Sequence, residues 1–317
     1  CGTFAATHGL VPLFGSRTTL LLLAGLLAVA AALVAARTGR RTAVALVVLA
    51  VGGSFLPRGP LRPAPVGQEL LAEVESRYQF LQVVRRAEPA PARTTLTINE
   101  GLDSFHSLEL ADSAFTDGAY YDWHALMPWC AGDGTRPTPL RALSLGDAAG
   151  TLRAVYAAVH PNAAVDAVDI DPATMALGDR FFTRSKADGE RFAIDGRVFV
   201  QLARRQWQVV HVDAYAHQVY VPAHLGSVEF FRAVHERLLP GGVVACNVGA
   251  LHRHDPVLQA LGATLAEAFG EAHAMLVPRS RNALLVARKQ QRFDPSVLRS
   301  ATAPVSLGSA DAQHWSG

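Results

Sequence analysis

Four aspartates stand at or next to the ends of short apolar runs that have the length of buried strands. They are Asp169, Asp171, Asp195 and Asp213, which close the runs 165–170, 192–194 and 207–212. In an open α/β sheet, ligands bind in the crevice outside the carboxyl ends of the strands. We therefore expect the four carboxylates along one edge of a sheet. There a carboxylate can accept hydrogen bonds from sugar hydroxyls or take a proton from an attacking amine. The alternative for each is an Asp that caps a helix or closes a turn.

The stretch 141–171, RALSLGDAAGTLRAVYAAVHPNAAVDAVDID, contains the unit that would hold a nucleoside. We predict strands over 142–145 and 165–170 and a helix over 151–159. Gly146 and Gly150 bracket the first turn, where small side chains let a ligand approach the backbone. Asp169 would then accept hydrogen bonds from both ribose hydroxyls. An ordinary βαβ unit with a solvated Asp is the alternative.

Strands alternate with helices along the rest of the chain. We predict helices over 172–182, 227–239 and 256–269, strands over 192–194, 207–212 and 243–248, and a terminal hairpin of 272–277 with 282–287. This alternation indicates a parallel, Rossmann-like α/β sheet with helices on both faces. Before it, strands over 78–85, 94–98 and 105–110 predict a small antiparallel β domain, followed by an aromatic-rich helix over 119–129.

Two apolar runs lie near the start of the chain. The first covers 18–36 and is long enough to cross a bilayer, which takes about 20 apolar residues. A shorter run covers 42–56, and the RTGRR segment between them would form a basic turn. We therefore expect a transmembrane helical hairpin. A signal peptide and a pair of buried core helices are the alternatives. Arginines flank the hairpin on both sides, so they do not fix its orientation.

The composition makes several kinds of partner improbable. The net charge is only +2 over 317 residues and no long basic run occurs, so nucleic acid is not an expected partner. The three cysteines are widely spaced and indicate no disulfide framework. We divide the chain into a membrane segment (1–57), a linker with the small β domain (58–137), a nucleoside-binding domain (138–290) and a tail (291–317). The chain begins with Cys, and we expect it to be a fragment of a longer protein.

Several segments occur together in an order and spacing that resemble one family, although no single segment is specific. They are Tyr78-Gln79, NEGLDSFHS (99–107), Tyr120-Tyr121-Asp122, LGDAAGTLR (145–153), VDID (168–171), IDGR (194–197), VDAY (212–215) and VPAHLGSVEFFRAVHERLLPGGV (221–243). Over about 78–286 the chain resembles the spermidine synthase (polyamine aminopropyltransferase) family. It is most similar to the membrane-fused type, in which transmembrane helices precede a domain with the S-adenosylmethionine-dependent methyltransferase-like fold.

This resemblance implies roles for the candidate residues. Asp169 would hold the ribose of the donor, Asp195 its adenine amine, and Asp213 would be the base for the acceptor amine. The other residues expected at the donor are Gly146, Asp147, Gly150, Asp171 and Gly196. Those expected at the acceptor are Asp103, Tyr121, Tyr215 and His217.

Three positions depart from the family pattern. The family's glycine-rich turn carries an Asp that grips the amine of the aminopropyl group, whereas this chain has Ala148 there and Asp147 one residue earlier. The family's second Asp after the base is missing, because Asp213 is followed by Ala-Tyr-Ala-His over 214–217. An acceptor-side Gln before a Ser is replaced by Asp103. The nucleoside half of the site is therefore better kept than the amine half.

The residues and the resemblance leave three hypotheses. The first is a membrane-anchored transferase that takes decarboxylated S-adenosylmethionine and transfers an aminopropyl group to a small-molecule amine. The second is a methyltransferase that uses S-adenosylmethionine itself. The third is a non-catalytic nucleoside-binding domain fused to a transporter-like membrane part. No metal is expected, because the histidines lack ligand spacing. The catalytic domain would be cytosolic, and a homodimer is one assembly that the sequence leaves open.

Overall fold

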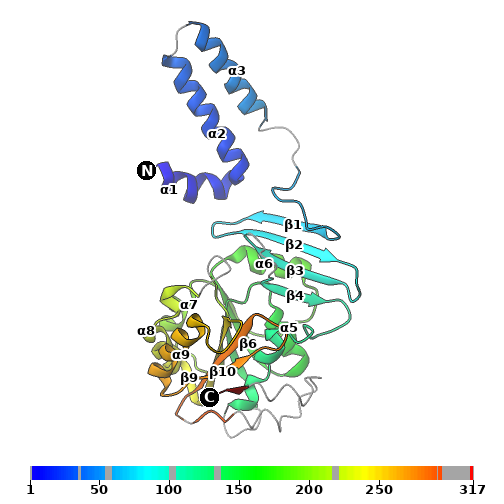
Figure 1. Cartoon of the computed structure of the whole chain (residues 1–317), viewed down its shortest axis with the longest axis vertical. Helices are drawn as coiled ribbons and strands as arrows, with labels where there is room; N and C mark the ends of the chain where they lie inside the picture. The colour runs from blue at the N-terminus through cyan, green and yellow to red at the C-terminus, as the bar shows by residue number, and fades with distance from the viewer. Residues whose placement is uncertain are drawn as a thin grey trace.

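The computed structural model describes residues 2–34, 37–53, 59–99, 105–131, 137–215, 221–290, 292–294 and 315–316. Within these residues, an eight-stranded sheet with helices on both faces forms the larger part of the molecule (Figure 1). A four-stranded antiparallel sheet lies beside it, and the N-terminal helices project beyond the small sheet. The expected Rossmann-like α/β sheet with a small antiparallel β domain before it is confirmed.

The large sheet consists of apolar segments whose alternate residues face two different cores. Its order is β12-β10-β11-β9-β8-β5-β6-β7. The strands are β5 (Arg141–Leu145), β6 (Ala164–Asp169), β7 (Arg191–Ala193), β8 (Trp207–Val212), β9 (Leu238–Gly249), β10 (His273–Leu276), β11 (Asn282–Arg288) and β12 (Trp315–Ser316). Neighbours from β9 to β7 are parallel, whereas β11 and β10 continue the sheet as an antiparallel hairpin. Val209 and Val210 show the alternation, because each is fully buried but in a different core.

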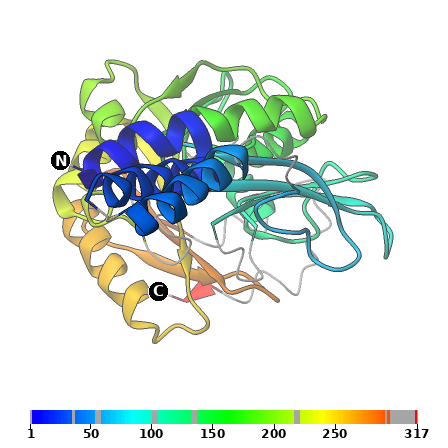
Figure 2. The ribbon, with the colours of Figure 1, turned by 90° about the horizontal axis from the view of Figure 1, so that it is seen from above.

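Helices cover both faces of this sheet, as is expected when parallel strands alternate with crossover helices. One face packs against α4 (Tyr120–His124), the 3₁₀ turn η2 (Met127–Cys130) and α5 (Thr151–Val159). The other face packs against α7 (Gly196–Leu202), the 3₁₀ turn η3 (Ala223–Leu225), α8 (Val228–Arg237) and α9 (Pro256–Phe269). The remaining helix of the α/β part, α6 (Pro172–Phe181), packs against the small sheet instead. The view from above shows these helices on either side of the strands (Figure 2).

The small sheet has the order β1-β2-β3-β4 and is antiparallel throughout. Its strands are β1 (Glu69–Glu75), β2 (Phe80–Arg86), β3 (Arg93–Ile98) and β4 (Ser107–Leu110). The last three were predicted, but β1 was not, because its residues are mostly half-buried and their polarity does not alternate strictly. Leu81 and Leu96 are fully buried against Leu177 of α6, so this sheet has its own apolar contact with the α/β part.

The N-terminal helices supply one candidate membrane span, not the two that we expected. The chain begins with α1 (Gly2–Ala5), a π-helical turn η1 (Ala6–Leu10) and α2 (Val11–Val34), and continues with α3 (Arg37–Gly53). Among the described residues, only the helical segment Gly2–Val34 is long and apolar enough to cross a membrane, with a mean hydropathy of 2.1. The apolar part of α3, Arg41–Gly53, is too short. A transmembrane hairpin is therefore not supported, and a single anchor or a signal sequence fits the long helix equally well.

Two side chains tie the base of the long helix to the rest of the molecule. The helix breaks at Gly15, whose φ is 76°. Directly after the break, the carboxylate of Glu75 in β1 accepts hydrogen bonds from the Ser16 hydroxyl and, at 2.8 Å, from the Ser16 amide. Arg17 donates to the carbonyl of Gly59 at 2.7 Å. The positive φ of Gly15 is a backbone conformation that residues with a Cβ rarely adopt, so glycine favours the break at this position.

Other differences from the predictions have local causes. The helix expected over 119–129 is split into α4 and η2, with Pro128 in the 3₁₀ turn. The strand β9 begins at Leu238, before the Pro-Gly-Gly segment that was expected to precede it, and α8 ends at Arg237. The short helix α7 was not predicted. Two residues of the expected loose tail, β12, pair with β10 instead.

Candidate active site

A cleft of about 970 Å³ opens at the carboxyl ends of the parallel strands. Asp169 at the end of β6, Asp195 before α7 and Asp213 after β8 all line this cleft. Of the four carboxylates expected along one edge of the sheet, these three line the cleft and Asp171 does not. Gly146, Gly196 and Tyr215 also line the cleft, as expected.

The turn between β5 and α5 places backbone, not side chains, against Asp169. Gly146 has a φ of 90°, and a Cβ there would lie 2.2 Å from the carbonyl oxygen of Asp213. Only glycine fits this contact, which brings the β5 and β8 ends of the cleft together. Two residues later, the amide of Ala148 donates a 2.8 Å hydrogen bond to Oδ2 of Asp169.

Asp169 is a buried carboxylate with one backbone donor on each oxygen. Besides the Ala148 amide on Oδ2, the Asp171 amide donates to Oδ1 at 2.9 Å. Burial raises the pKa of Asp169 to about 6, although these hydrogen bonds favour its charged form. Each carboxylate oxygen has a second lone pair, so Asp169 can still accept two hydroxyl groups from the cleft.

Asp171 and Asp147, both expected at the donor, do not line the cleft. The carboxylate of Asp171 caps α6 by accepting from the Ala173 amide at 3.0 Å and also accepts from the Ser76 hydroxyl at 2.5 Å. Asp147 is buried beneath the turn, where its Oδ2 lies 3.1 Å from Nε of Arg153. Neither residue lines the cleft, so this placement does not support their expected contact with a donor.

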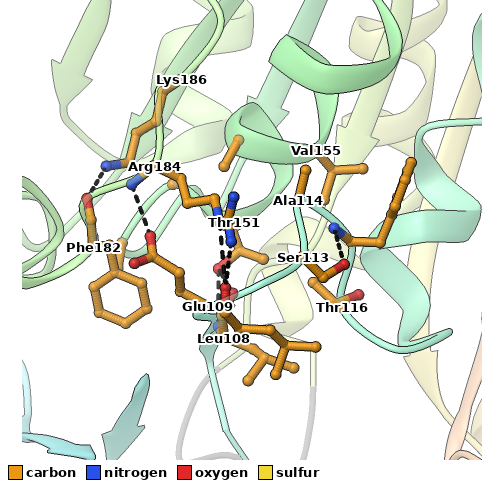
Figure 3. Close-up of a pocket in the computed structure, with 15 residues that line it drawn as sticks. Leu108, Glu109, Ser113, Ala114, Thr116, Thr151, Val155, Phe182, Arg184 and Lys186 are labelled. Carbon is orange, nitrogen blue, oxygen red and sulfur yellow. Dashed lines mark hydrogen bonds between the residues drawn. The ribbon is translucent and has the colours of Figure 1, made fainter. Parts of the chain in front are cut away.

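A second, much smaller pocket lies between β4 and α5 (Figure 3). Its volume of about 10 Å³ is that of one water molecule. The hydroxyl of Thr151 accepts from the Leu108 amide at 2.9 Å, and Glu109 accepts from the Arg184 amide at 2.9 Å, which joins the small sheet to the α/β part. Gly150 lines this pocket and not the cleft, so its expected contact with a donor is not supported either.

The carboxylate of Asp195 already has partners on both oxygens. Oδ1 accepts from the amides of Arg197 and Val198 and so caps α7, and Oδ2 lies 2.9 Å from Nε2 of His224. Partial burial opposes ionisation, but the Val198 amide and the His224 ring outweigh it and lower the pKa of Asp195. Asp195 is therefore an anion at the cleft wall, with Gly196 beside it.

Asp213 is the titratable group best suited to proton transfer in this cleft. Burial raises its pKa to about 7, against hydrogen bonds that favour the charged form. One of these comes from Nδ2 of Asn247, 2.8 Å from Oδ1, and another from the phenol of Tyr120. Burial, and then the charge of Asp213, raise the pKa of Tyr120 well above its usual value, so the phenol keeps its proton and donates it to the hydrogen bond.

A buried histidine pair fixes α4, and with it Tyr120, against β8. The Nδ1 atoms of His124 and His211 are 2.8 Å apart, and the hydroxyl of Tyr156 lies 2.6 Å from Nε2 of His211. Burial lowers the pKa of His124 to about 3 and that of His211 well below its usual value, so both rings are neutral. Neither imidazole lines the cleft, and we assign this pair to positioning.

The remaining acceptor-side residues are placed as follows. Tyr215 lines the cleft, where its hydroxyl donates to the carbonyl of Asn247 at 3.0 Å and accepts from the Gly249 amide at 2.7 Å. Tyr121 is buried on α4 and does not line the cleft, whereas its neighbour Tyr120 does. Asp103 and His217 lie outside the described residues.

Comparison with known proteins shows which proteins this chain is similar to. No protein-family model matches the chain. The chain is 31% identical over 223 residues to a probable polyamine aminopropyl transferase of Bifidobacterium longum (strain NCC 2705), an alignment that covers 69% of this chain and 47% of that protein. This similarity supports the resemblance of the chain to the spermidine synthase family. A second relative, a polyamine aminopropyltransferase of Vibrio vulnificus (strain CMCP6), is 27% identical over 150 residues, which is 45% of this chain and 48% of that protein. The chain thus spans about half the length of these curated relatives.

Solved structures of spermidine synthases have the same fold. A probable spermidine synthase from Corynebacterium glutamicum ATCC 13032 has a TM-score of 0.59 and 20% identity, over 75% of this chain and 87% of that one. A spermidine synthase in complex with the transition-state analogue AdoDATO has a TM-score of 0.57 and 15% identity, over 75% and 80% of the two chains. At these low identities, the likeness is one of fold alone.

The sequence did not identify several residues that the cleft of this spermidine synthase relative contains. In the sequence, Tyr120 stands out only as the neighbour of Tyr121, and Asn247 is one residue of the predicted strand 243–248. A polar side chain near the carboxyl end of a buried strand is a usable signal, and Asn247 has it. His224 and the β10–β11 turn also line the cleft. Neither directly follows a parallel strand, so the search for residues at strand ends does not find them. Among the described residues, no three His, Cys, Asp or Glu side chains are grouped so that they could hold a metal ion.

Proposed function

We propose that this chain transfers an aminopropyl group from decarboxylated S-adenosylmethionine to a small-molecule amine. The family resemblance and the polyamine aminopropyltransferase names of its relatives support this reaction. The cleft has a nucleoside side and a proton-accepting side, and both are formed by the ends of parallel strands. Decarboxylated S-adenosylmethionine would be a co-substrate, and the reaction needs no metal.

The donor would occupy the cleft between β5, β6 and α7. Asp169 would accept hydrogen bonds from the ribose hydroxyls, and the Asp195 anion lies where it would attract the exocyclic amine of adenine. The amide turn at Gly146 allows the donor to approach the backbone. Burial raises the pKa of Asp169 to about 6, so the residue is mostly ionised at neutral pH and able to accept these bonds.

The chemistry would be a direct displacement at the donor's sulfonium centre. A neutral acceptor amine attacks the carbon next to sulfur, the new N–C bond forms while the C–S bond breaks, and methylthioadenosine leaves with the electron pair. The alkylated amine then loses a proton to Asp213. The protein contributes mainly by holding the two reactants in line. A base with a pKa of about 7 can accept this proton at neutral pH and release it to water afterwards.

The observation that carries the proposal is the pairing of Asp169 and Asp213 in one cleft, with Tyr120 and Asn247 holding the second carboxylate. This combination, with the raised pKa of Asp213, is typical of a group that changes its protonation state during a reaction.

The test is a transfer assay on the full chain with labelled decarboxylated donor and a set of amines, together with calorimetric binding of the donor and of methylthioadenosine. We expect Asp213→Asn to bind donor normally but to lose transfer, and Asp169→Asn to weaken donor binding. Asp179→Asn is the matched control, because Asp179 pairs with Arg191 on the surface and does not line the cleft. Donor binding without transfer to any amine would refute the proposed reaction, and the absence of donor binding would also refute the nucleoside site.

Ala148 favours methyl transfer as a second candidate. In the family pattern an Asp at this position grips the amine of the aminopropyl group, and alanine offers no such contact. If the chain instead binds intact S-adenosylmethionine more tightly than the decarboxylated form, and the product gains a methyl group, the second candidate is correct.

We also propose that the long apolar helix anchors the protein in a membrane, as in the membrane-fused type of this family. Leu27 and Leu33 leave 71% and 75% of their surface exposed, which is unfavourable in water. The cleft-bearing part would then lie on the cytosolic side, where adenosyl donors are made. A homodimer is compatible with this arrangement. Sedimentation of the full chain with membranes after cell lysis tests the anchor, and recovery in the soluble fraction would contradict it.

A further inference from the structure

The turn between β10 and β11 brings two arginines to the side of the cleft opposite the nucleoside. Arg279 and Arg281 line the cleft, and the turn is followed by Asn282, the first residue of β11. In the sheet order β11-β9-β8-β5-β6, β8, which ends just before Asp213, lies between β11 and β6, which ends at Asp169. The two guanidinium groups therefore belong to the acceptor half of the cleft.

Hydrogen bonds connect this turn to the proposed base. Nδ2 of Asn282 donates to Oδ1 of Asn247 at 2.9 Å, and Nδ2 of Asn247 donates to Oδ1 of Asp213 at 2.8 Å. The carbonyl of Arg281 accepts from the Ala250 amide at 2.9 Å, which holds the turn against the end of β9. The arginine turn is thus fixed relative to the atom that would receive the proton.

Arg279 also reaches the other wall of the cleft, next to the helix that carries Tyr120. Its Nη2 atom lies 3.8 Å from the position that a Cβ would take on Gly118, two residues before α4 begins. Arg279 therefore reaches from the β10–β11 turn toward the start of α4, the helix that carries Tyr120.

The charged groups of the cleft are unequally satisfied. Each carboxylate that lines the cleft has a hydrogen-bond partner. Asp195 pairs with His224, and Asp213 accepts from Asn247. Asp255 accepts from the Val257 amide at 2.9 Å, and Asp169 accepts from two backbone amides. Arg279 and Arg281 are exposed and have no ion-pair partner within the described part of the chain. Among the described residues, the cleft thus offers two arginines without an ion-pair partner and no carboxylate without a hydrogen-bond partner beside the base.

We propose that the acceptor of this enzyme is an amine whose chain ends in an anionic group, a carboxylate or a phosphate, that binds Arg279 and Arg281. This inference rests on the proposed function. A guanidinium matches a carboxylate or a phosphate with two parallel hydrogen bonds. It repels the second ammonium group of a free diamine or polyamine, and the sequence after Asp213 supplies no second carboxylate over 214–217 to offset that repulsion.

The experiment compares matched acceptors on the full chain in detergent, with decarboxylated S-adenosylmethionine as donor. The pair 1,4-diaminobutane and 4-aminobutanoate differ in one terminal charge, and phosphoethanolamine and vesicles that contain phosphatidylethanolamine separate a soluble phosphate from a lipid headgroup. Release of methylthioadenosine and the mass of the alkylated product are measured. We expect kcat/KM for at least one anionic amine to exceed that for 1,4-diaminobutane by about 10-fold or more.

The variants Arg279→Gln and Arg281→Gln connect this preference to the turn. Because a hydrogen bond to a charged group is lost, each should raise KM for the anionic acceptor roughly 10- to 100-fold and leave donor binding unchanged. Turnover of 1,4-diaminobutane should stay the same or improve. The matched control is Arg204→Gln, an exposed arginine that does not line the cleft, for which no change is expected.

The outcomes separate this inference from the proposed function. Transfer to 1,4-diaminobutane that equals or exceeds transfer to every anionic amine would overturn the inference and leave aminopropyl transfer standing. Weaker binding of intact S-adenosylmethionine in both arginine variants, with an unchanged acceptor KM, would assign the arginines to the donor and also overturn it. No transfer to any amine would overturn the proposed function and the inference with it.

Discussion

Replacing Tyr120 by Phe should move the pH dependence of the reaction without removing the base. The phenol of Tyr120 donates a hydrogen bond to Asp213, which favours the charged carboxylate. Transfer requires that charged form, so kcat/KM should rise as the pH rises through about 7 in the unmodified protein. Without the phenol, burial opposes ionisation with less compensation, and the midpoint of this rise should move to higher pH.

The size of the effect follows from the lost hydrogen bond. A hydrogen bond to a charged group contributes about 1.5–3 kcal/mol, and about 1.4 kcal/mol corresponds to a tenfold change in rate or equilibrium. On the acidic side of the profile, kcat/KM should therefore fall roughly 10- to 100-fold. On the basic side, where Asp213 is ionised in both proteins, the two profiles should converge.

The assay is the initial rate of methylthioadenosine release at subsaturating acceptor, measured over a range of pH. Tyr156→Phe is the matched control, because it removes a buried phenol that bonds to His211 and does not line the cleft. Its profile should keep the midpoint of the unmodified protein even if its stability falls. A uniform loss of rate in Tyr120→Phe at every pH, with an unmoved midpoint, would refute the assignment of Tyr120 to the ionisation of Asp213.

Three further predictions concern stability and binding. Gly146→Ala should unfold at a markedly lower temperature in a thermal melt, because its Cβ would meet the Asp213 carbonyl at 2.2 Å, and an unchanged melting temperature would contradict this. Asp169→Asn should raise the calorimetric Kd of methylthioadenosine roughly 10- to 100-fold, since charged hydrogen bonds to the ribose are lost; an equal Kd would move the ribose elsewhere. Asp213→Asn should stabilise the fold at basic pH, because the raised pKa of about 7 means that ionising the buried carboxyl costs folding energy. That advantage should be full above about pH 7 and shrink as the pH falls toward about 4, the unfolded pKa, and a gain that grows in acid would show the opposite sign.

The regular elements could be predicted well because their boundaries are encoded locally. The helix α5, the strand β8 and the helix α9 match their predicted ranges of 151–159, 207–212 and 256–269 residue for residue. Each begins or ends at a residue with a specific backbone role, such as Gly150 before α5 and Asp255 before α9. The strand β1, which has no such signal, was missed, and so was α7, although Asp195 caps its start, because this helix has only seven residues.

Side-chain directions at the ends of elements could not be predicted from spacing. Asp169 ends a strand and faces the cleft, but the chain turns after it, so Asp171 caps the next helix instead of continuing the alternation. Tyr120 and Tyr121 are adjacent on a helix, where successive side chains point about 100° apart, and only the structure shows which one reaches Asp213. The aspartates predicted the correct edge of the sheet, but the side chains that shift their pKa values come from other parts of the chain.

The bond between Ser16 and Glu75 has a consequence for how this domain would meet its substrates. A helix held in a bilayer by a loose linker would let the attached domain tumble, so the cleft would sample every direction. Here Gly15 permits the backbone to bend directly into a carboxylate of β1, and Arg17 holds the returning chain at Gly59. If the long helix lies in a bilayer as proposed, these contacts would hold the domain at the membrane surface and keep the cleft entrance at a constant height and direction above the lipid. Reactants that diffuse along that surface would meet the entrance far more often than the same molecules arriving from bulk solution.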